Sequence, residues 1–242
     1  MLRILLCPVM MVCIFLSGCK DEPVDHSTEG LVHARNGEYD KAISEFTKAL
    51  ETNPTSVEAY YNRGLAYYHK GQYDRAVADY DKAIEINPGY AEAYDNRGTT
   101  YAEKAEYDKA IADFARAVEI YPEFAGAFYN RGVVYEQQRE YDKAIADFTR
   151  AIEINDRYAG AYCNRGLAYG KKGLFDLAIA DWDKAIEIDP GMVEAYNNRA
   201  VARLGTKDYD KAWEDVEKAQ SLGSRFPAEF LEKLRQASGR DK

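Results

Sequence analysis

The sequence has few of the residue types from which catalytic and metal sites are usually built. It contains only three histidines, and His26, His33 and His69 do not show the spacing typical of a metal site. A glycine-rich phosphate loop and a recognisable nucleophile motif are missing as well. We therefore expect no metal, no cofactor, no catalytic residue and no small-molecule substrate.

Cysteine is too scarce beyond the N-terminus to form a disulfide framework. Cys7, Cys13 and Cys19 lie at the start of the chain, and Cys163 is the only cysteine that follows them. A single cysteine is more often a small, partly buried residue than a reactive thiol. We therefore expect Cys163 to have a packing role.

The chain also lacks an excess of positive charge. It has 32 Lys and Arg residues against 41 Asp and Glu residues, which gives a formal charge of −9. Such a chain repels a phosphate backbone, so we expect no nucleic-acid partner. The hydrophobic fraction of 46% is nevertheless that of a folded protein rather than of a disordered one.

An apolar segment opens the chain. Arg3 is followed by mainly apolar residues at 4–16, a stretch too short for a membrane-spanning helix but of the length of a signal-peptide core. The next residues, Ser17, Gly18 and Cys19, together with Leu16, resemble the lipobox of bacterial lipoproteins. The resemblance implies a signal peptide at 1–18 and a lipid on Cys19. An ordinary secretory signal or an uncleaved anchor is the alternative.

The lipobox resemblance also implies a location. More than one acyl chain on Cys19 would attach the protein stably to a membrane, and residues 19–28 would form a polar tether. In Gram-negative lipoproteins, Asp directly after the lipidated Cys favours the inner membrane, and this chain has Lys20 there. We therefore expect a membrane lipoprotein that faces the periplasm, in the outer membrane rather than the inner one.

Two short motifs recur along the chain every 34 residues. Asn-Arg-Gly occurs at 62–64, 96–98, 130–132 and 164–166, and Asn-Arg-Ala follows at 198–200. A motif similar to Tyr-Asp-Lys-Ala recurs at the same interval, at 39–42, 73–76, 107–110, 141–144, 175–178 and 209–212. A fixed period of this length indicates a repeat architecture.

The period and the residue pattern resemble the tetratricopeptide repeat (TPR). Six repeats begin at about residues 23, 57, 91, 125, 159 and 193, with Gly or Ala at repeat position 8, Ala at positions 20 and 27, and an aromatic residue at position 24 in five of them. The resemblance implies an all-α fold, a right-handed α-α superhelix. The solenoid would cover residues 29–226, with a capping helix at 227–238.

Each repeat is predicted to form two amphipathic helices, at about positions 1–14 and 18–30. Small residues let the two helices approach closely, and neighbouring hairpins must stack because one hairpin cannot bury its apolar face alone. Asp at position 18 is expected to be the N-cap of the second helix. The first helix of the chain is expected to be short or frayed, because His26 and His33 replace aromatic residues and Glu29 stands at position 7.

Arginine at position 7 faces an acidic residue at position 23. Both positions lie eight residues from the turn near position 15, so their side chains should meet at the same height of the hairpin. We expect structural ion pairs, because the planar guanidinium can bind a carboxylate through two hydrogen bonds. A basic ligand-binding stripe is the less favoured alternative. The expected pairs are Arg63–Asp79, Arg97–Asp113, Arg131–Asp147 and Arg165–Asp181.

Asparagine at position 6 forms a ladder on the helix face that lines the concave groove of TPR proteins. An amide can bind both the N–H and the C=O of an extended peptide, so this ladder could hold a partner segment. Alternatively, it supports neighbouring side chains, and the sequence leaves both interpretations open. The candidate partner-binding residues are Asn62, Asn96, Asn130, Asn164 and Asn198, with Tyr61 and Tyr129 beside them.

The remaining groove charges are mainly acidic, as at Glu58, Glu92 and Glu103, which favours a neutral or basic ligand. We expect a membrane-anchored scaffold or adaptor of the bacterial envelope that binds other proteins or peptides, and not an enzyme. The alternative is an assembly factor similar to a pilotin, which escorts a secretin or pilus subunit to the outer membrane.

Overall fold

The computed structural model describes residues 25–240. The expected signal peptide, Cys19 and most of the tether lie outside the described residues. Every element in the described range is a helix. These helices are α1 (His26–Arg35), α2 (Tyr39–Thr52), α3 (Val57–His69), α4 (Tyr73–Ile86), α5 (Ala91–Glu103), α6 (Tyr107–Ile120), α7 (Ala125–Gln137), α8 (Tyr141–Ile154), α9 (Ala159–Lys171), α10 (Phe175–Ile188), α11 (Val193–Gly205), α12 (Tyr209–Ser221) and α13 (Ala228–Ser238).

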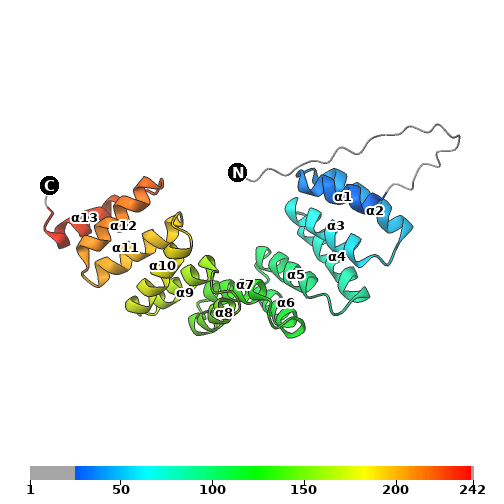
Figure 1. The fold of residues 1–242 in the computed structure, drawn as a ribbon. Coiled ribbons are helices and arrows are strands. Elements are labelled where there is room, and N and C mark those ends of the chain that lie inside the picture. Colours follow the sequence, from blue (N-terminus) through cyan, green and yellow to red (C-terminus); the bar gives the residue numbers. More distant parts are fainter. Residues whose placement is uncertain (1–24, 241–242) are drawn as a thin grey trace, which may run out of the picture.

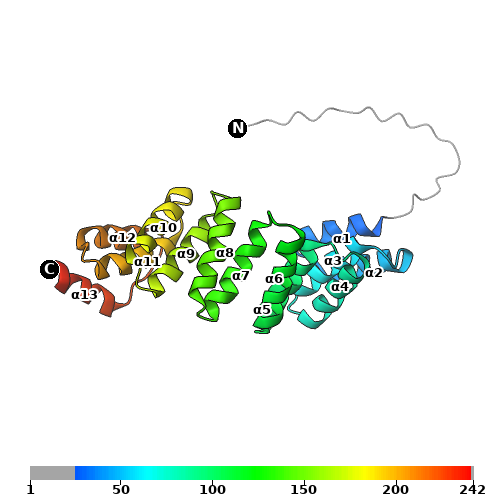
Figure 2. The same cartoon turned by 90° about the horizontal axis from the view of Figure 1, so that it is seen from below.

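The helices stack in chain order as hairpins and form an open arc (Figure 1). Figure 2 shows α1 at one end of the stack and α13 at the other. Each helix packs mainly on its neighbours in the sequence, and successive odd-numbered helices also touch one another. The odd-numbered helices therefore form the more crowded, inner side of the curve. The predicted all-α solenoid of six helical hairpins is confirmed.

The start of the second helix of each repeat differs from the prediction. The N-cap of α4 is Gln72, at position 16, and its side chain forms no capping hydrogen bond. Asp74, at position 18, is therefore the second residue of the helix rather than its N-cap. A carboxylate in the first turn still lies near the positive end of the helix dipole. The Asp residues at this position also bind a lysine of the next repeat, as Asp74 binds Lys104 at 2.7 Å.

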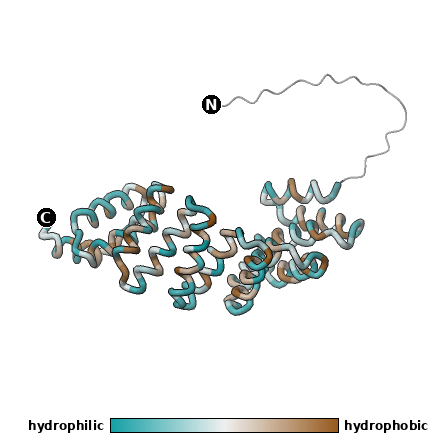
Figure 3. The backbone as a smooth tube through the Cα atoms, turned by 60° about the horizontal axis from the view of Figure 1, so that its bottom comes forward, coloured by the Kyte–Doolittle hydropathy of each residue, from teal (hydrophilic) through white to brown (hydrophobic). Residues whose placement is uncertain are grey.

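The core consists of small residues on one helix that face aromatic rings on the next. Gly132 of α7 lies directly against the ring of Phe148, which is completely buried. Ala144 and Ala151 are completely buried beside it. Hydrophobic and hydrophilic residues are interspersed along each helix, because only one stripe of each helix faces the core (Figure 3). No helix within residues 25–240 is both long and apolar enough to cross a membrane.

The two ends of the solenoid depart from the regular repeat. Helix α1 has 10 residues, against 13 in the other first helices, and it begins at His26, three residues before the expected start of the solenoid. At the other end, Leu234 of α13 is completely buried, and Phe230 packs on the same cluster. Trp213 donates its Nε1–H to Ser238 Oγ at 3.1 Å. Helix α13 thus covers the apolar face of the last hairpin.

Two polar contacts recur between neighbouring repeats. In the first, which we call the lysine tie, Lys at position 14 binds Asp at position 18 of the preceding repeat. In the second, the arginine tie, Arg at position 7 donates from Nη1 to Thr or Asp at position 25 of the preceding repeat. The lysine ties are Lys70–Asp40, Lys104–Asp74 and Lys172–Asp142. The arginine ties are Arg63–Thr47, Arg97–Asp81, Arg165–Thr149 and Arg199–Asp183.

The junction between the third and fourth repeats lacks both ties. Gln138 occupies the lysine position and Ala115 occupies the acceptor position, so neither contact can form as it does elsewhere. Gln138 Oε1 is buried and has no hydrogen-bond partner among the described residues. Of the five repeat junctions in the described chain, this one alone has neither tie, although Asn130 and Asp95 still form a hydrogen bond across it.

Two glycines of the inner helices provide a matched test of this packing. A Cβ at Gly132 would lie 2.7 Å from Phe148 Cε1, whereas a Cβ at Gly160 would meet nothing closer than Tyr129 Oη at 3.5 Å. We expect Gly132→Ala to lower the free energy of unfolding by about 1–3 kcal/mol through overpacking. Gly160→Ala should be neutral or stabilising by up to about 1 kcal/mol, because alanine favours a helix. Urea unfolding followed by circular dichroism measures both, and equal effects would contradict this account of the core.

Candidate functional site

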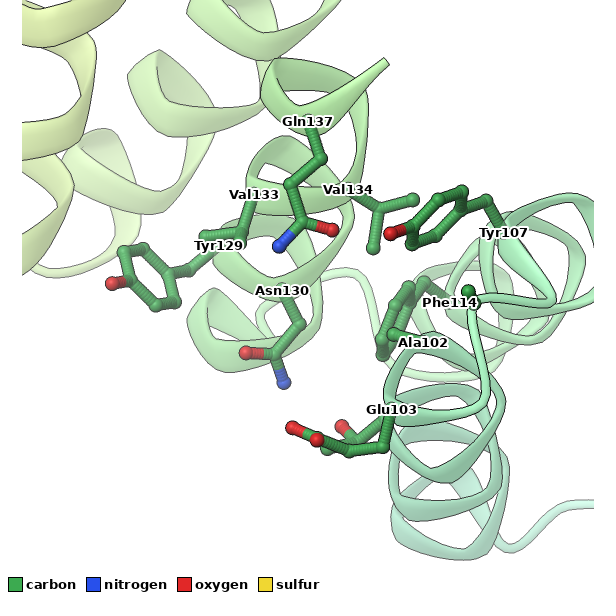
Figure 4. Close-up of a pocket in the computed structure, with 11 residues that line it drawn as sticks. Ala102, Glu103, Tyr107, Phe114, Tyr129, Asn130, Val133, Val134 and Gln137 are labelled. Atoms are coloured by element: carbon green, nitrogen blue, oxygen red, sulfur yellow. The ribbon is translucent and has the colours of Figure 1, made fainter.

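The inner side of the arc holds a pocket between α5 and α7. The pocket has a volume of about 360 Å³, and its lining includes Glu103 from α5, Asn130 and Val133 from α7, and Tyr107 from α6. Figure 4 shows the side chains of Glu103 and Asn130 directed toward the same space from opposite helices. This pocket lies at the junction between the third and fourth repeats. It combines an apolar wall with a few polar groups, as binding sites commonly do.

The arginines at position 7 lie inside the hairpins and do not form a basic stripe. Arg131 donates from Nε and Nη2 to the two oxygens of Asp147, each at 2.7 Å. Asp147 is only 6% exposed, and the guanidinium also lies 5.5 Å from the ring centre of Phe128. The same arrangement holds Arg63 on Asp79, Arg97 on Asp113 and Arg165 on Asp181. These arginines are therefore committed to structural contacts.

Three of the five ladder asparagines donate hydrogen bonds across a repeat junction. Asn96 Nδ2 donates to Tyr61 Oη at 2.9 Å, and Asn164 Nδ2 donates to Tyr129 Oη at 3.0 Å. Asn130 Nδ2 donates to Asp95 Oδ1 at 3.0 Å. The structure thus assigns a supporting role to the amide nitrogens. The amide oxygens of these three residues accept no hydrogen bond from the described part of the chain, so they remain free as acceptors.

Asn62 and Asn198 end the ladder differently. Neither side chain forms a hydrogen bond within residues 25–240, and both side chains are partly exposed on the inner helices. The residue at position 5 of the preceding repeat explains the difference. Ser27 has a shorter side chain than the Tyr and Asp residues that accept from the central amides, and Cys163 is a weak acceptor.

Tyr61 and Tyr129 are half-buried and pack against other rings. The ring of Tyr61 lies 4.9 Å from that of Tyr90, and the ring of Tyr129 lies 4.9 Å from that of Tyr158. Burial raises the pKa of Tyr61 to about 12, with a further contribution from the acidic side chains nearby. The hydroxyl groups therefore stay protonated and serve the ladder as neutral acceptors.

Asp95 belongs to the acidic residues that the sequence places on the groove, but its burial was not predicted. It stands at the position that Tyr61 and Tyr129 occupy in the neighbouring repeats, and it is 9% exposed. Burial raises the pKa of Asp95 to about 6, the charge of Glu92 adds to this effect, and the hydrogen bond from Asn130 opposes it. Because a short polar residue replaces a large ring here, a departure from the repeat pattern was the available signal.

Cys163 occupies the same repeat position further along. Its side chain is 6% exposed, and burial raises the pKa of the thiol to about 11. The thiol is therefore protonated at neutral pH and a poor nucleophile. Its backbone carbonyl accepts a hydrogen bond from Trp182 Nε1 at 3.1 Å, so the residue belongs to the packing of this hairpin.

Comparison with known proteins places these features in a family. Sequence models of the tetratricopeptide repeat match residues 27–91, 79–112, 100–139, 125–158 and 159–192. The chain belongs to the tetratricopeptide repeat family. A comparison with curated proteins gives no match.

Several solved TPR structures resemble this one. MamA is 32% identical, with a TM-score of 0.62, over 66% of this chain and 94% of MamA. YrrB, described as a TPR protein with an unusual peptide-binding site, is 28% identical, with a TM-score of 0.64, over 80% of this chain and 97% of YrrB. A TPR protein from Parabacteroides merdae is 24% identical, with a TM-score of 0.62, over 88% and 83% of the two chains, and shows the shared fold alone.

The raised pKa of Asp95 predicts a pH-dependent cost. Its pKa rises from an ordinary value of 3.8 to about 6 on folding, so the folded state holds this proton more tightly and loses stability as the pH rises from about 4 through about 6. Asp95→Asn removes the charge and keeps an acceptor for Asn130. We expect this variant to be more stable than the parent chain by about 1–3 kcal/mol at neutral pH and to match it near pH 4.

Thermal or urea unfolding at the two pH values measures the effect. Asp108→Asn changes the net charge equally at an exposed position, and we expect it to alter the free energy of unfolding by less than about 0.5 kcal/mol at either pH. If Asp95→Asn destabilises the protein at neutral pH, the carboxylate contributes favourably and this account of its burial is wrong.

Proposed function

We propose that this TPR protein is a membrane-anchored adaptor of the bacterial envelope that binds an extended segment of a partner protein along its inner groove. The family consists in general of scaffolds that bind other proteins, not of enzymes. The proposal rests on the row of free amide oxygens beside the pocket that contains Glu103, on the inner side of the arc.

The hydrogen bonds within the ladder define what the groove can recognise. The nitrogens of Asn96 and Asn130 each donate two hydrogen bonds within the protein, so these residues offer a partner an acceptor. Asn164 donates one and offers its oxygen together with its second N–H. An extended peptide presents backbone N–H groups along its length, and one such group could meet one amide oxygen in each repeat. Recognition of the backbone would tolerate many partner sequences.

The charges of the groove favour neutral or basic segments. Glu58, Glu92, Glu103 and Glu194 are exposed on the inner helices. Their charges would attract Lys and Arg side chains and repel acidic segments, chiefly by changing the rate of association. YrrB, with its peptide-binding site on a similar solenoid, supports the transfer of this general function to the present chain.

The lipobox-like sequence supports the membrane anchor. From Cys19 to the start of α1 at His26, the chain has seven residues to cross. Even fully extended, they reach at most about 25 Å. A lipid on Cys19 would therefore hold the first repeat close to the bilayer, and the arc would extend from there toward its partners.

A charge reversal in the pocket tests the binding function. Glu103→Lys replaces an exposed acidic residue of the pocket, and Glu119→Lys makes the same change on α6, where Glu119 pairs only with Arg116. We expect Glu103→Lys to weaken the binding of basic nine-residue peptides about fivefold or more, whereas Glu119→Lys leaves it nearly unchanged. Fluorescence anisotropy with basic, neutral and acidic peptide sets measures the affinities. Equal binding of the three sets, or equal effects of the two variants, would argue against the groove as the site.

The anchor can be tested independently of binding. Cys19→Ser removes the expected lipidation site, so the protein should move from the membrane fraction to the soluble periplasmic fraction and lose the incorporation of labelled palmitate. Cys13→Ser lies in the same leader and should leave both readouts unchanged. Membrane attachment that survives Cys19→Ser would show that another segment holds the protein.

A further inference from the structure

The first repeat departs from the other five at three positions that meet in space. In the later repeats, position 4 is Tyr or Phe, position 7 is Arg and position 23 is Asp. The first repeat has His26, Glu29 and Glu45 at these positions. A histidine thus replaces the ring over which the guanidinium lies, and a carboxylate replaces the guanidinium itself.

These three side chains converge at one place. One ligand atom from each of His26, Glu29 and Glu45 lies within 4.8 Å of the other two. His26 Nδ1 lies 2.6 Å from Glu45 Oε2, within hydrogen-bond distance. The side chains of His26 and Glu45 are 29% and 12% exposed, and Glu29 is exposed, so an ion can reach the cluster from solution.

The cluster lacks a positive charge where every later repeat has one. Glu29 and Glu45 bring two carboxylates together where each later repeat pairs an arginine with an aspartate, and a cation between them would offset their repulsion. Lys48 compensates in part, because its Nζ lies 2.6 Å from Glu45 Oε1. In the next four repeats, the equivalent Lys or Arg instead binds a Glu three residues later, as Lys82 binds Glu85. In the first repeat the lysine thus binds Glu45 Oε1, and an ion would replace the contact between Glu45 Oε2 and His26 Nδ1.

We propose that His26, Glu29 and Glu45 bind one divalent transition-metal ion of the Zn²⁺ type in the place of the missing guanidinium. The ion would take one imidazole nitrogen and one oxygen from each carboxylate, and the proton between His26 and Glu45 would leave to solvent. A nitrogen together with two carboxylate oxygens is a ligand set that Zn²⁺ accepts, whereas Ca²⁺ and Mg²⁺ prefer oxygen ligands alone.

The ion would staple the first hairpin. His26 and Glu29 belong to α1, and Glu45 belongs to α2. Helix α1 is the shortest helix of the described chain, with 10 residues. Metal binding there would stabilise the first hairpin, which follows the expected tether. The stability of this hairpin would then depend on the metal concentration around the protein.

The chain offers matched variants for a test. Glu29→Arg and His26→Tyr each restore the residue type of the later repeats, so both should fold, and Glu29→Arg can pair with Glu45 as the other arginines pair with aspartate. His33→Gln is the control, because it removes the other histidine of α1. His33 Nδ1 lies 2.5 Å from Glu38 Oε2, and His33 is not part of the cluster of His26, Glu29 and Glu45. Circular dichroism checks the helix content of each variant.

Titration of the full-length chain in detergent with Co²⁺, followed by its visible absorption bands, measures binding, and Zn²⁺ should displace the Co²⁺. We expect one ion per chain, an affinity lowered about tenfold or more in Glu29→Arg and in His26→Tyr, and unchanged binding in His33→Gln. Calorimetry should show a melting temperature raised by Zn²⁺ in the parent chain and not in Glu29→Arg. Absence of saturable Co²⁺ binding would overturn the proposal. Equal affinity in Glu29→Arg and the parent chain would overturn it as well.

Discussion

The buried fork between arginine and aspartate is the contact on which the solenoid depends. It joins the two helices of a hairpin at one height, because its residues lie 16 apart on either side of the turn, as Arg131 and Asp147 do. Each guanidinium also lies over an aromatic ring of its own helix, and in most repeats it reaches back to the preceding one. One arginine side chain therefore joins the two helices of its hairpin, packs on an aromatic ring and, in most repeats, binds the preceding repeat. For this reason, its replacement by Glu29 alters the chemistry of the whole first hairpin.

At the three central residues of the asparagine ladder, the nitrogen of each amide supports the structure, and its oxygen is the atom that we propose for binding a partner. The amide nitrogens bind a group of the preceding repeat, and this bond fixes the plane of the amide and leaves its oxygen without a hydrogen bond from the described residues. A side chain held in this way loses less conformational freedom when a partner binds. The two interpretations that the sequence left open are thus compatible, because support of the neighbouring repeat prepares the acceptor for a ligand.

The regular part of the structure follows from the sequence, and its departures do not. The 34-residue period, with small residues at three positions, is sufficient to predict the helices and their pairing. It also predicts the contact between Arg63 and Asp79. The first residue of each second helix could not be read from Asp74, because the turn is closed by backbone hydrogen bonds rather than by a side-chain cap. The burial of Asp95 depends on Asn130 of the next repeat. The cluster at His26 joins residues 3 and 16 apart, a spacing that becomes meaningful only once the two helices are packed.

The missing ties at Gln138 and Ala115 have a mechanical consequence. When a force bends a stack of repeats, most of the bending occurs at the junction with the weakest contacts. The hydrogen bond between Asn130 and Asp95 still crosses this junction, but neither tie stiffens it, so the arc would flex more there than at the junctions that have both ties. The pocket between α5 and α7 lies at that junction. A ligand bound there would therefore change the angle between the two halves of the arc, and with it the distance between the two ends of the solenoid.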